Sequence, residues 1–386
     1  MDDLFCLEDQ FTADEKLARD TVSRFVDTEV LPIIADCYEK AYFPVNLIKK
    51  MAALGLFGMT LPENMGGAGM NQVAYGLVCQ ELERGDSALR SFVSVQSSLG
   101  MYPIFAYGSE NQKNRFLPKM AQGELIGCFG LTEPDSGSDP DSMKTTATKV
   151  AGGWRLNGSK MWITNATIAD LAIIWAKDEK GIVRGFIVEK IFAGFSTHEI
   201  KQKLSLRASV TGEIVLQDCF VPDDNLLPKT EDGLVCALAC LTKARYGIAF
   251  GAIGAAMACY DIALQYAKER IQFGKPIASF QLIQADLVDM LAEIVKAQTL
   301  NLQLGRLHDQ NRASYVMISL AKMNACREAI KIARKARNIL GANGISLEYH
   351  VCRHMSNLES VMTYEGTDNI HHLIVGRHIT GINAFG

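Results

Sequence analysis

The stretch WRLNGSKMWIT, residues 154–164, decides the fold class because it is a strand signal in an otherwise helical chain. Asn157-Gly158 stands between two strand-like arms, which predicts a type I′ hairpin at that dipeptide. Two further apolar stretches, LAIIWAK and GIVRGFIVEK, flank an Asp-Glu-Lys-Gly turn, and GEIVLQDCFVP ends at Pro222. Together these stretches predict a β-domain in the middle of the chain.

The segments on both sides of this block have helical patterns. Thr12 and Glu15 form a capping-box pattern ahead of an apolar periodic run. The order of helices, strands and helices has no βαβ alternation, which excludes a doubly wound parallel sheet as the main architecture. The predicted helices cover 44–54, 72–84, 87–107, 109–121, 252–271, 280–310, 314–340 and a last segment that begins near Thr367.

A chain of 386 residues is too long for one ordinary hydrophobic core. We therefore predict an α+β multi-domain fold. It has an N-terminal α-helical domain over 1–125, a middle β-domain over 126–232 and a C-terminal helical domain over 233–386.

Composition excludes several functional classes. A net charge of −4 argues against nucleic acid as the main partner, because phosphate binding requires a clustered basic surface. The ten cysteines include no CxxC pair, which favours reduced thiols over a disulfide or zinc framework. His350 and His354 have i,i+4 spacing but no glutamate arranged as in a zincin, so no metal is expected. Neither GxGxxG nor a Walker loop occurs.

The N-terminus is acidic and lacks the features of a secretory signal or a transit peptide. The longest apolar stretch, Gly247 to Cys259, is too short and too rich in Ala and Gly to span a bilayer. We expect no stable membrane insertion and a cytoplasmic, bacterial-type location, or the mitochondrial matrix if a transit peptide has been removed.

Two loops and one turn contain candidate binding or catalytic residues. CFGLTEPDSGSDP at 128–140 and WITNA at 162–166 place hydroxyl and amide groups where strands end. Such loops on a rigid β-scaffold can bind a planar ligand rich in hydrogen-bonding groups, although turn formation alone also explains them. Glu365 is a lone carboxylate on a Gly-containing turn beside Tyr364. By itself it could be a solvated acid.

These motifs, together with RIQFGKPIASFQ (270–281), ILGANGIS (339–346) and YEGTDNI (364–370), resemble the acyl-CoA dehydrogenase family of flavoproteins. The resemblance covers nearly the whole chain. It implies that the middle domain is β-barrel-like and that the C-terminal domain is a four-helix bundle. ELERGDSALRSFVSVQSSL (81–99), LSLRASVTGEI (204–214) and ARYGIAFGAIGA look most like the glutaryl-CoA dehydrogenase branch.

The resemblance implies a two-part reaction on glutaryl-CoA. Glu365 removes the α-proton as the β-hydride passes to FAD, and the glutaconyl product then loses carbon dioxide to give crotonyl-CoA. Burial would raise the pKa of this base towards ~6–7. Arg90 would pair bidentately with the distal carboxylate, unless it forms a helix-surface ion pair with Asp86. The substrate-binding positions implied are Glu83, Arg90, Ser91, Ser138, Arg245, Tyr364 and Gly366.

The resemblance also implies an FAD site shared between subunits. Thr164 would bond near flavin N5, and Thr132 near the pyrimidine side. The full set implied is Phe129, Leu131, Thr132, Gly137, Ser138, Trp162, Ile163, Thr164, Arg270, Phe273, Gln281, Asn338, Leu340, Gly341 and Thr367. Because Arg270, Phe273 and Gln281 match positions that act across a subunit contact, a homotetramer is implied. Electron-transfer flavoprotein would be the acceptor, and the pathway would be lysine and tryptophan degradation.

One departure leaves alternatives open. The branch usually has Gly-Tyr before the arginine, whereas this chain has Ala88-Leu89. The alternatives are a dehydrogenase for another short or branched acyl-CoA and a non-decarboxylating glutaryl-CoA dehydrogenase, which Tyr364 argues against. An acyl-CoA oxidase and a non-catalytic flavin-binding or acyl-CoA-binding protein are the others.

Overall fold

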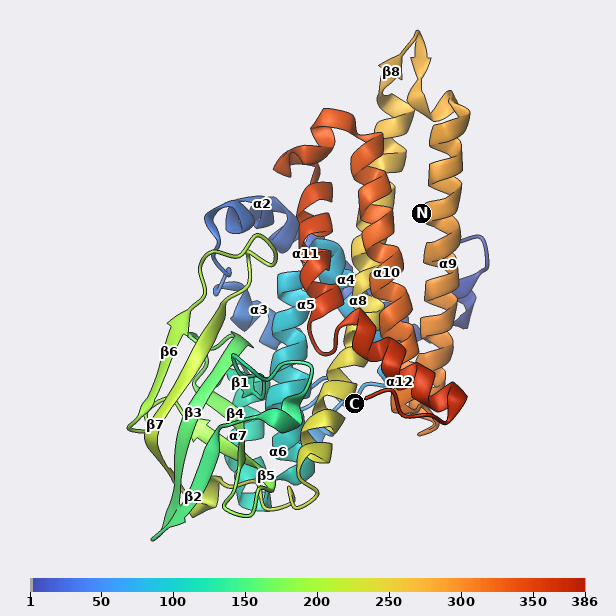
Figure 1. Ribbon diagram of the computed structural model, residues 1–386. Coiled ribbons are helices and arrows are strands. Elements are labelled where there is room, and N and C mark those ends of the chain that lie inside the picture. Colours follow the sequence, from blue (N-terminus) through green and yellow to red (C-terminus); the bar gives the residue numbers. More distant parts are fainter. Residues whose placement is uncertain (1–2, 386) are drawn as a thin grey trace.

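A computed structural model describes residues 3–385 of this chain, and its helices and strands form three parts (Figure 1). The N-terminal part is helical, and Thr12 and Glu15 form the predicted capping box at the start of its first helix. Its helices are α1 (Ala13–Phe25), α2 (Leu31–Lys40), α3 (Leu47–Ala53), α4 (Gln72–Gly85), α5 (Ser87–Ser94), α6 (Tyr102–Tyr107) and α7 (Glu110–Ala121). Two π-helical turns, η2 (Val26–Val30) and η4 (Val95–Met101), continue α1 and α5.

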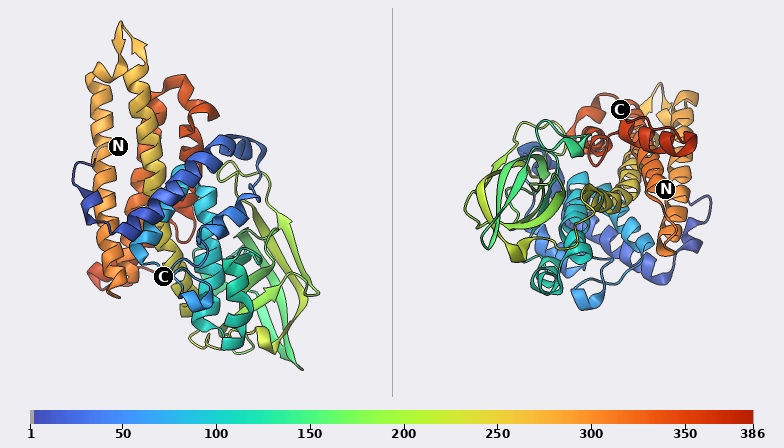
Figure 2. Two further views of the ribbon diagram at one scale, coloured as in Figure 1. Left: turned by 180° about the vertical axis from the view of Figure 1, so that it is seen from behind. Right: turned by 60° about the horizontal axis from the view of Figure 1, so that its bottom comes forward.

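The middle part is a curled seven-stranded sheet, which Figure 2 shows nearly end-on in its right-hand view. Its strands are β1 (Gly127–Gly130), β2 (Thr146–Val150), β3 (Gly153–Thr164), β4 (Leu171–Lys177), β5 (Val183–Glu189), β6 (Phe195–Glu199) and β7 (Thr211–Pro222). The strand order is β1-β4-β2-β3-β7-β6, with β5 paired to β4. Most pairs are antiparallel, whereas β1 and β2 pair with β4 in parallel. The predicted turn between LAIIWAK and the next strand is confirmed, since β4 and β5 form an antiparallel pair.

The hairpin predicted at Asn157-Gly158 is wrong. Strand β3 continues through this dipeptide, and its pairing with β7 shifts register between Leu156 and Gly158. Asn157 accepts a hydrogen bond from the Asp218 N–H at 2.8 Å, which secures a bulge instead of a turn. The chain reverses at residues 151–152, because Val150 and Gly153 are paired.

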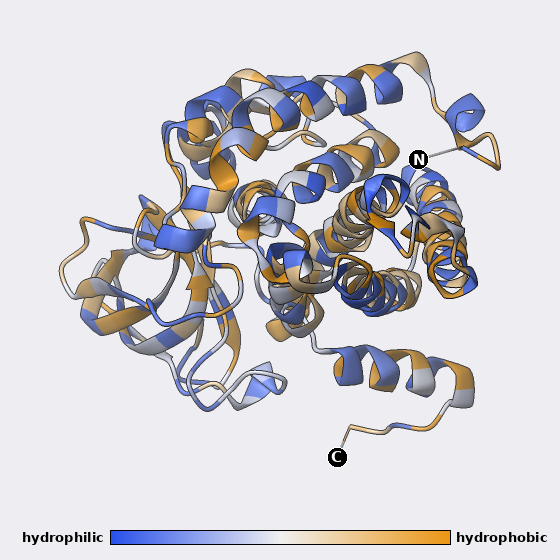
Figure 3. Ribbon diagram, turned by 90° about the horizontal axis from the view of Figure 1, so that it is seen from above, coloured by the Kyte–Doolittle hydropathy of each residue, from blue (hydrophilic) through white to orange (hydrophobic). Residues whose placement is uncertain are grey.

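The C-terminal part is helical again. Its helices are α8 (Leu234–Glu269), α9 (Gln281–Asp309), α10 (Tyr315–Ile339), α11 (Val351–Thr363) and α12 (Asp368–Thr380). A small hairpin of β8 (Ile271–Gln272) and β9 (Lys275–Pro276) projects from the end of α8 and α9 (Figure 1). Figure 3 shows α12 set apart at one edge of the molecule. Short 3₁₀ turns are η1 (Leu7–Gln10), η3 (Glu63–Met65), η5 (Pro140–Ser142), η6 (Asp223–Asn225), η7 (Ile277–Ser279), η8 (Gly341–Ile345) and η9 (Leu347–Tyr349).

Helix α8 is longer than predicted and forms the centre of the molecule. It begins at Leu234 instead of near Ala252, and it is long and apolar enough to cross a membrane by length and composition alone. However, 72% of its most apolar window is buried inside the protein, as is common for a core helix. Helices α4 and α10 both pack along α8, so side chains from all three meet in one place.

Candidate active site

The turn between α11 and α12 carries Glu365 in an uncommon backbone conformation. Its φ of 53° lies in the left-handed region, and Gly366 follows at φ 98°. Thr367 then caps α12 by accepting the Ile370 N–H at 3.3 Å. A left-handed residue that is not glycine is costly, and such strain persists only where neighbouring groups hold it.

The carboxyl group of Glu365 is desolvated and has a raised pKa. Its Oε2 atom is buried and has no hydrogen-bond partner among residues 3–385, although other parts of the side chain keep some exposure. Burial raises the pKa of Glu365 to about 7, against the opposing effect of Arg90, Arg245 and Lys322. A carboxyl group with a pKa near neutrality can both accept and return a proton.

The carbonyl groups of Tyr364, Glu365 and Gly366 in this turn bind cations. Lys322 Nζ on α10 donates to the carbonyl oxygens of Tyr364 at 3.0 Å, Gly366 at 2.8 Å and Met362 at 3.5 Å. Arg245 Nε on α8 donates to the Glu365 carbonyl at 2.7 Å. The two cations therefore fix the turn from the side of α8 and α10.

A buried polar network joins this turn to α4 and α5. Arg90 Nε donates to Glu83 Oε2 at 2.6 Å, and Arg90 Nη2 donates to the Tyr364 hydroxyl. Ser87 Oγ donates to the other Glu83 oxygen at 2.8 Å. Glu83 and Arg90 are 0% and 1% exposed, so the pair is shielded from water. A Cβ on Gly251 of α8 would overlap Glu83 Oε2, so glycine is required there.

The alternative of a surface pair between Arg90 and Asp86 is not formed. Arg90 points into the protein, while Asp86 accepts from the Ala88 N–H at 2.7 Å and pairs with the buried Arg353. Asn357 Nδ2 donates to the same carboxylate at 2.9 Å. Asp86 is thus an N-cap and a buried ion-pair partner at the start of α5.

The loop after β1 is held against the end of β3 by a second buried ion pair. Lys160 Nζ donates to Glu133 Oε1 at 2.8 Å and to the Leu131 carbonyl at 3.1 Å. Burial lowers the pKa of Lys160 to about 8. Glu133 also accepts from the Lys144 and Thr145 N–H groups at 2.6 and 3.0 Å. The loop therefore has a rigid base although much of its outer face is exposed.

This region has the features of a site for a flat aromatic ligand. Trp162 is 60% exposed at φ 62°, next to a register shift in β3. The left-handed backbone conformation and the exposed apolar ring both cost free energy, and a ligand that covers the ring would offset the second cost. No atom lies within 4 Å of the position that a Cβ on Gly137 would take, so a ligand can approach that backbone closely. These residues fit an isoalloxazine ring and its ribityl chain.

The structure places the remaining predicted residues in three groups. Ser91 is 3% exposed on α5 beside Arg90, whereas Ser138 is exposed on the loop after β1. Phe129, Leu131, Thr132, Ile163 and Thr164 lie on β1, on the loop after it and at the end of β3. Six further predicted cofactor positions lie near the projecting hairpin, far from the β-domain in Figures 1 and 2. This distant group is Arg270, Phe273, Gln281, Asn338, Leu340 and Gly341. Phe273 at the hairpin tip is 92% exposed with φ 51°.

Sequence reasoning missed two groups that touch the Glu365 turn. Lys322 lies on the apolar face of α10 between Ile318 and Cys326, and a lysine at such a position is a detectable signal. His371 on α12 is 0% exposed, and both ring nitrogens lack partners within residues 3–385. Burial lowers its pKa to about 3, so the imidazole is neutral.

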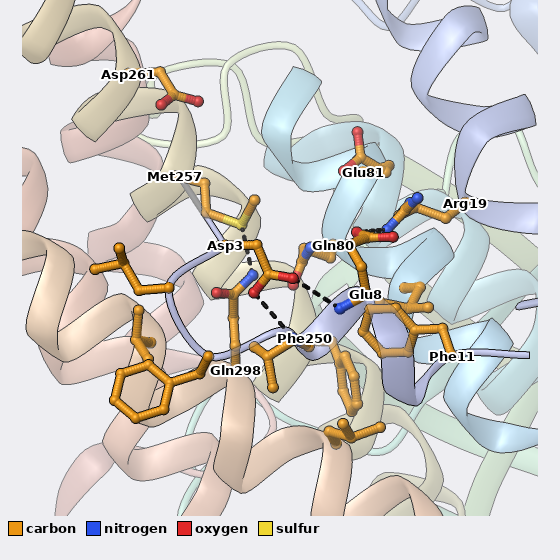
Figure 4. A pocket seen from close by; sticks show the side chains of 16 residues that line it. Asp3, Glu8, Phe11, Arg19, Gln80, Glu81, Phe250, Met257, Asp261 and Gln298 are labelled. Atoms are coloured by element: carbon orange, nitrogen blue, oxygen red, sulfur yellow. Dashed lines mark hydrogen bonds and ion pairs between the residues drawn. The ribbon is translucent and has the colours of Figure 1, made fainter. Parts of the chain in front are cut away.

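A cavity among the described residues lies away from the Glu365 turn. It has a volume of about 250 Å³ and lies between the N-terminal segment and helices α4, α8 and α9 (Figure 4). Its lining includes Gln80, Phe250, Met257 and Gln298. None of the predicted catalytic, substrate or cofactor residues line it. We place the candidate active site at the Glu365 turn because a carboxyl group with a raised pKa and several buried cations converge there.

Comparison with known proteins identifies one family along the whole chain. The models for the N-terminal, middle and C-terminal domains of acyl-CoA dehydrogenase match residues 12–124, 128–219 and 231–380. The acyl-CoA dehydrogenase of Bacillus subtilis (strain 168) is 39% identical over 376 residues, covering 96% of this chain and 99% of that protein. The glutaryl-CoA dehydrogenase of Desulfococcus multivorans is 36% identical over 370 residues, covering 94% and 95%.

The chain is also similar to solved structures of this family. The crystal structure of glutaryl-CoA dehydrogenase from Mycobacterium smegmatis matches with a TM-score of 0.98 at 50% identity, covering 100% of this chain and 99% of that chain. A glutaryl-CoA dehydrogenase from Mycobacterium smegmatis in complex with FADH2 matches with a TM-score of 0.97 at 48% identity, covering 99% and 98%.

Proposed function

The chain belongs to the acyl-CoA dehydrogenase family, and we propose from that membership that it oxidises glutaryl-CoA and decarboxylates the product. The observation that carries this proposal is the buried network of Glu83, Arg90 and Tyr364 against the Glu365 turn. A buried arginine in this network suits a substrate that ends in a carboxylate. The similar glutaryl-CoA dehydrogenases of known structure support the same substrate.

The cofactor is FAD, as in the rest of the family. When bound, FAD supplies a two-electron acceptor for the hydride that leaves the β-carbon. The loop over 129–138 and the end of β3 at Trp162 to Thr164 would hold the isoalloxazine and ribityl parts. Thr367 at the N-cap of α12 would be a further contact.

Glu365 would remove the α-proton of the thioester. At a pKa of about 7, a substantial fraction of the carboxylates are ionised at neutral pH, and each is a stronger base than an ordinary glutamate. The developing negative charge on the thioester oxygen needs a hydrogen-bond donor. The Glu365 N–H is a candidate donor, because it makes no hydrogen bond with residues 3–385.

Decarboxylation would follow at the same residues. Loss of carbon dioxide from glutaconyl-CoA leaves a dienolate, and the proton held by Glu365 would return to it to give crotonyl-CoA. Three N–H bonds of the Arg90 fork have no partner among residues 3–385 and are free for the departing carboxylate. Glu83 and the Tyr364 hydroxyl would keep the fork in place.

The further assignments follow from the same proposal. Electron-transfer flavoprotein would accept the electrons, and the protein would act in the cytoplasm or the mitochondrial matrix. A homotetramer would bring the hairpin of one chain, with Arg270 and Phe273, to the FAD of another. The exposed Phe273, and exposed apolar side chains such as Ile379 and Ile382 on and after α12, support assembly.

A second candidate is a dehydrogenase for a short or branched acyl-CoA without a distal carboxylate. Glu83 already neutralises Arg90 within the protein, which favours a purely structural pair. Leu89, which replaces the tyrosine usual in the glutaryl-CoA branch, is fully buried in the apolar core that the N-terminal helices share with the β-domain and α8. This candidate retains Glu365 and FAD in their proposed roles.

Turnover of the purified protein on glutaryl-CoA with an artificial electron acceptor tests the proposal. Mass-resolved crotonyl-CoA and carbon dioxide are the expected products. Glutaconyl-CoA alone would assign the non-decarboxylating reaction. Activity confined to butyryl-CoA or isobutyryl-CoA would select the second candidate.

A further inference from the structure

Lys322 is a buried cation without a carboxylate directly opposite it. The side chain is 1% exposed, and burial lowers its pKa. Its ammonium group has three N–H bonds, and three backbone carbonyls accept them, all between Met362 and Gly366. Burying a charge in this way is costly, so an arrangement that commits every donor to one turn calls for an explanation.

The peptide group between Tyr364 and Glu365 connects Lys322 to the proposed oxyanion donor. In a planar trans peptide, the carbonyl and the N–H point in opposite directions. Lys322 binds the Tyr364 carbonyl at 3.0 Å, so the Glu365 N–H points away from α10. That N–H makes no hydrogen bond within residues 3–385, as required of a group reserved for a ligand.

Arg245 fixes the next peptide group of the turn. Its Nε atom donates to the Glu365 carbonyl at 2.7 Å from α8, so consecutive carbonyls are held by two different helices. Gly366 has little room for a side chain, because a Cβ would lie 3.1 Å from the His371 ring and 3.3 Å from Arg245 Nη2, and its φ of 98° disfavours any other residue. The turn cannot rotate without breaking these contacts, so its N–H direction is set before a ligand binds.

We propose that Lys322 is a positioning residue that aims the Glu365 N–H at the thioester oxygen of the substrate through their shared peptide plane. This inference rests on the proposed acyl-CoA dehydrogenase function, and it extends that function to a residue on α10. Lys322 does not touch the substrate. It keeps an oxyanion donor and the catalytic carboxylate on one pre-formed turn.

The charged groups around Glu365 determine how the pH dependence of kcat changes in a Lys322 variant. Charged or titratable groups come from every neighbouring helix, so removing one cation leaves the others in place. These groups are Glu83 on α4, Arg90 on α5, Arg245 on α8, Lys322 on α10, His371 on α12 and the adjacent Tyr364. Loss of Lys322 alone should therefore raise the apparent pKa that limits kcat at acid pH by about one unit. The reason is that one of the cations that stabilise ionised Glu365 has been removed.

The direct test is the infrared stretch of the thioester carbonyl in FAD-loaded protein. Glu365→Gln binds acyl-CoA without consuming it, and a ¹³C label on the carbonyl of butyryl-CoA or glutaryl-CoA isolates the band. A strong hydrogen bond from residue 365 N–H shifts the band to lower wavenumber. We expect the shift to be largely lost in the double variant Glu365→Gln/Lys322→Met. An undiminished shift in the double variant overturns the proposal.

Kinetics on the single variants give a second readout. Lys322→Met should lower kcat by about 10- to 100-fold with KM changed by less than about threefold, since a misaimed oxyanion donor acts on the transition state. Lys331→Met on the same helix is the control, because Lys331 pairs with Glu328 at the surface and should retain full activity. A fall in Tm for Lys322→Met with kcat and the pH profile intact would mean a merely structural role.

Two further measurements separate this inference from the proposed function. If Lys322→Met fails to fold with FAD, Lys322→Gln retains a donor without the charge and enters the same infrared comparison. If no acyl-CoA binds the Glu365→Gln protein, the proposed function fails, and hydrogen exchange then tests the turn alone. Faster exchange of the residue 365 and 366 amides in the Lys322 variant than in Lys331→Met supports the positioning role, and equal rates overturn it.

Discussion

Glu365 combines a strained backbone with a desolvated carboxyl group, and both features cost free energy. A left-handed conformation at a residue that is not glycine costs about 1–3 kcal/mol. Arg245 and Lys322 offset this cost by binding three of the turn's carbonyls. The residue is therefore held in a state that the unfolded chain would rarely visit, which is expected of a pre-organised base.

Glu365→Gln should retain yellow FAD and acyl-CoA binding and lose turnover by several orders of magnitude, because the amide cannot accept the α-proton. In the native protein, kcat should fall as pH drops through about 7, since the base must be ionised. Steady-state rates between pH 5.5 and 9 measure both effects. Near-normal turnover of the variant would remove Glu365 from the base role.

The same substitution should raise thermal stability above neutral pH. The pKa of Glu365 is about 7 in the folded chain against an ordinary value of 4.5, so the folded state binds the extra proton between these values. Stability therefore declines as pH rises through this window and stays lower above it. Glu365→Gln cannot ionise, and its Tm should exceed that of the native protein at pH 8, with the difference shrinking at pH 5.

Arg90→Gln should reduce kcat/KM for glutaryl-CoA far more than for butyryl-CoA, because the substrate carboxylate would lose its partner in a dry site. Removing Arg90 also leaves Glu83 buried and unpaired, which destabilises the protein for a separate reason. The double variant Glu83→Gln/Arg90→Gln is the matched control for that effect. Equal losses on both substrates would assign Arg90 a structural role only.

At the scale of elements, α8 provides the space for the buried pair on α4 and α5. A Cβ on Gly251 would overlap Glu83 Oε2 and approach Arg90 Nε to 3.1 Å. Gly251→Ala should therefore displace the pair, lower stability by about 1–3 kcal/mol and reduce glutaryl-CoA turnover. Gly376→Ala on α12 is the control, because nothing lies within 4 Å of its Cβ position. There the change should be neutral or stabilising by up to ~1 kcal/mol.

Local pattern predicted most of the elements and failed where one pattern has two structural outcomes. The capping box at Thr12 and the strand that ends at Pro222 depend on near neighbours, and both are confirmed. Asn157-Gly158 is typical of a turn and of a bulge alike, and its cross-strand partner Asp218 decides between them. The helix predicted over 87–107 contains the π-helical turn η4, for which the local pattern carries no signal.

At the site too, contacts between adjacent residues could be predicted and contacts between distant residues could not. A single motif places Tyr364, Glu365 and Gly366 together, so adjacent residues of the turn could be predicted. Lys322 meets that turn only because α10 packs beside it, across 42 residues of sequence for the Tyr364 contact. The partner of Asp86 is likewise 267 residues away on α11. Contacts of this kind depend on the assembled fold, which periodicity does not encode.

At the scale of the whole molecule, one loop joins all three parts. Arg207 donates to the carbonyls of Tyr38 and Glu39 on α2, at 2.9 and 2.8 Å. The Leu206 N–H donates to Asn357 Oδ1 on α11 at 2.8 Å. Asn357 in turn donates to Asp86, so this loop of the β-domain is coupled to the helix that carries Arg90.

Asn357→Ala should lower the free energy of unfolding by about 2–3 kcal/mol, because it leaves a buried N–H and part of a buried carboxylate unsatisfied. Denaturant titration measures the change. Ser205→Ala in the same loop is the control, since it removes only half-buried hydroxyl contacts with α11 and should cost less than about 1 kcal/mol. Equal effects would mean that Asn357 does not link the parts.

The projecting hairpin has a genetic consequence. If Phe273 and Arg270 complete the FAD site of a neighbouring chain, each site draws residues from two polypeptides. A chain altered in the hairpin and a chain altered at Glu365 would each be inactive alone. Mixed assemblies of the two would contain some sites with an intact hairpin from one parent and an intact base from the other. Co-expression should therefore restore part of the activity, as in intragenic complementation between two defective alleles.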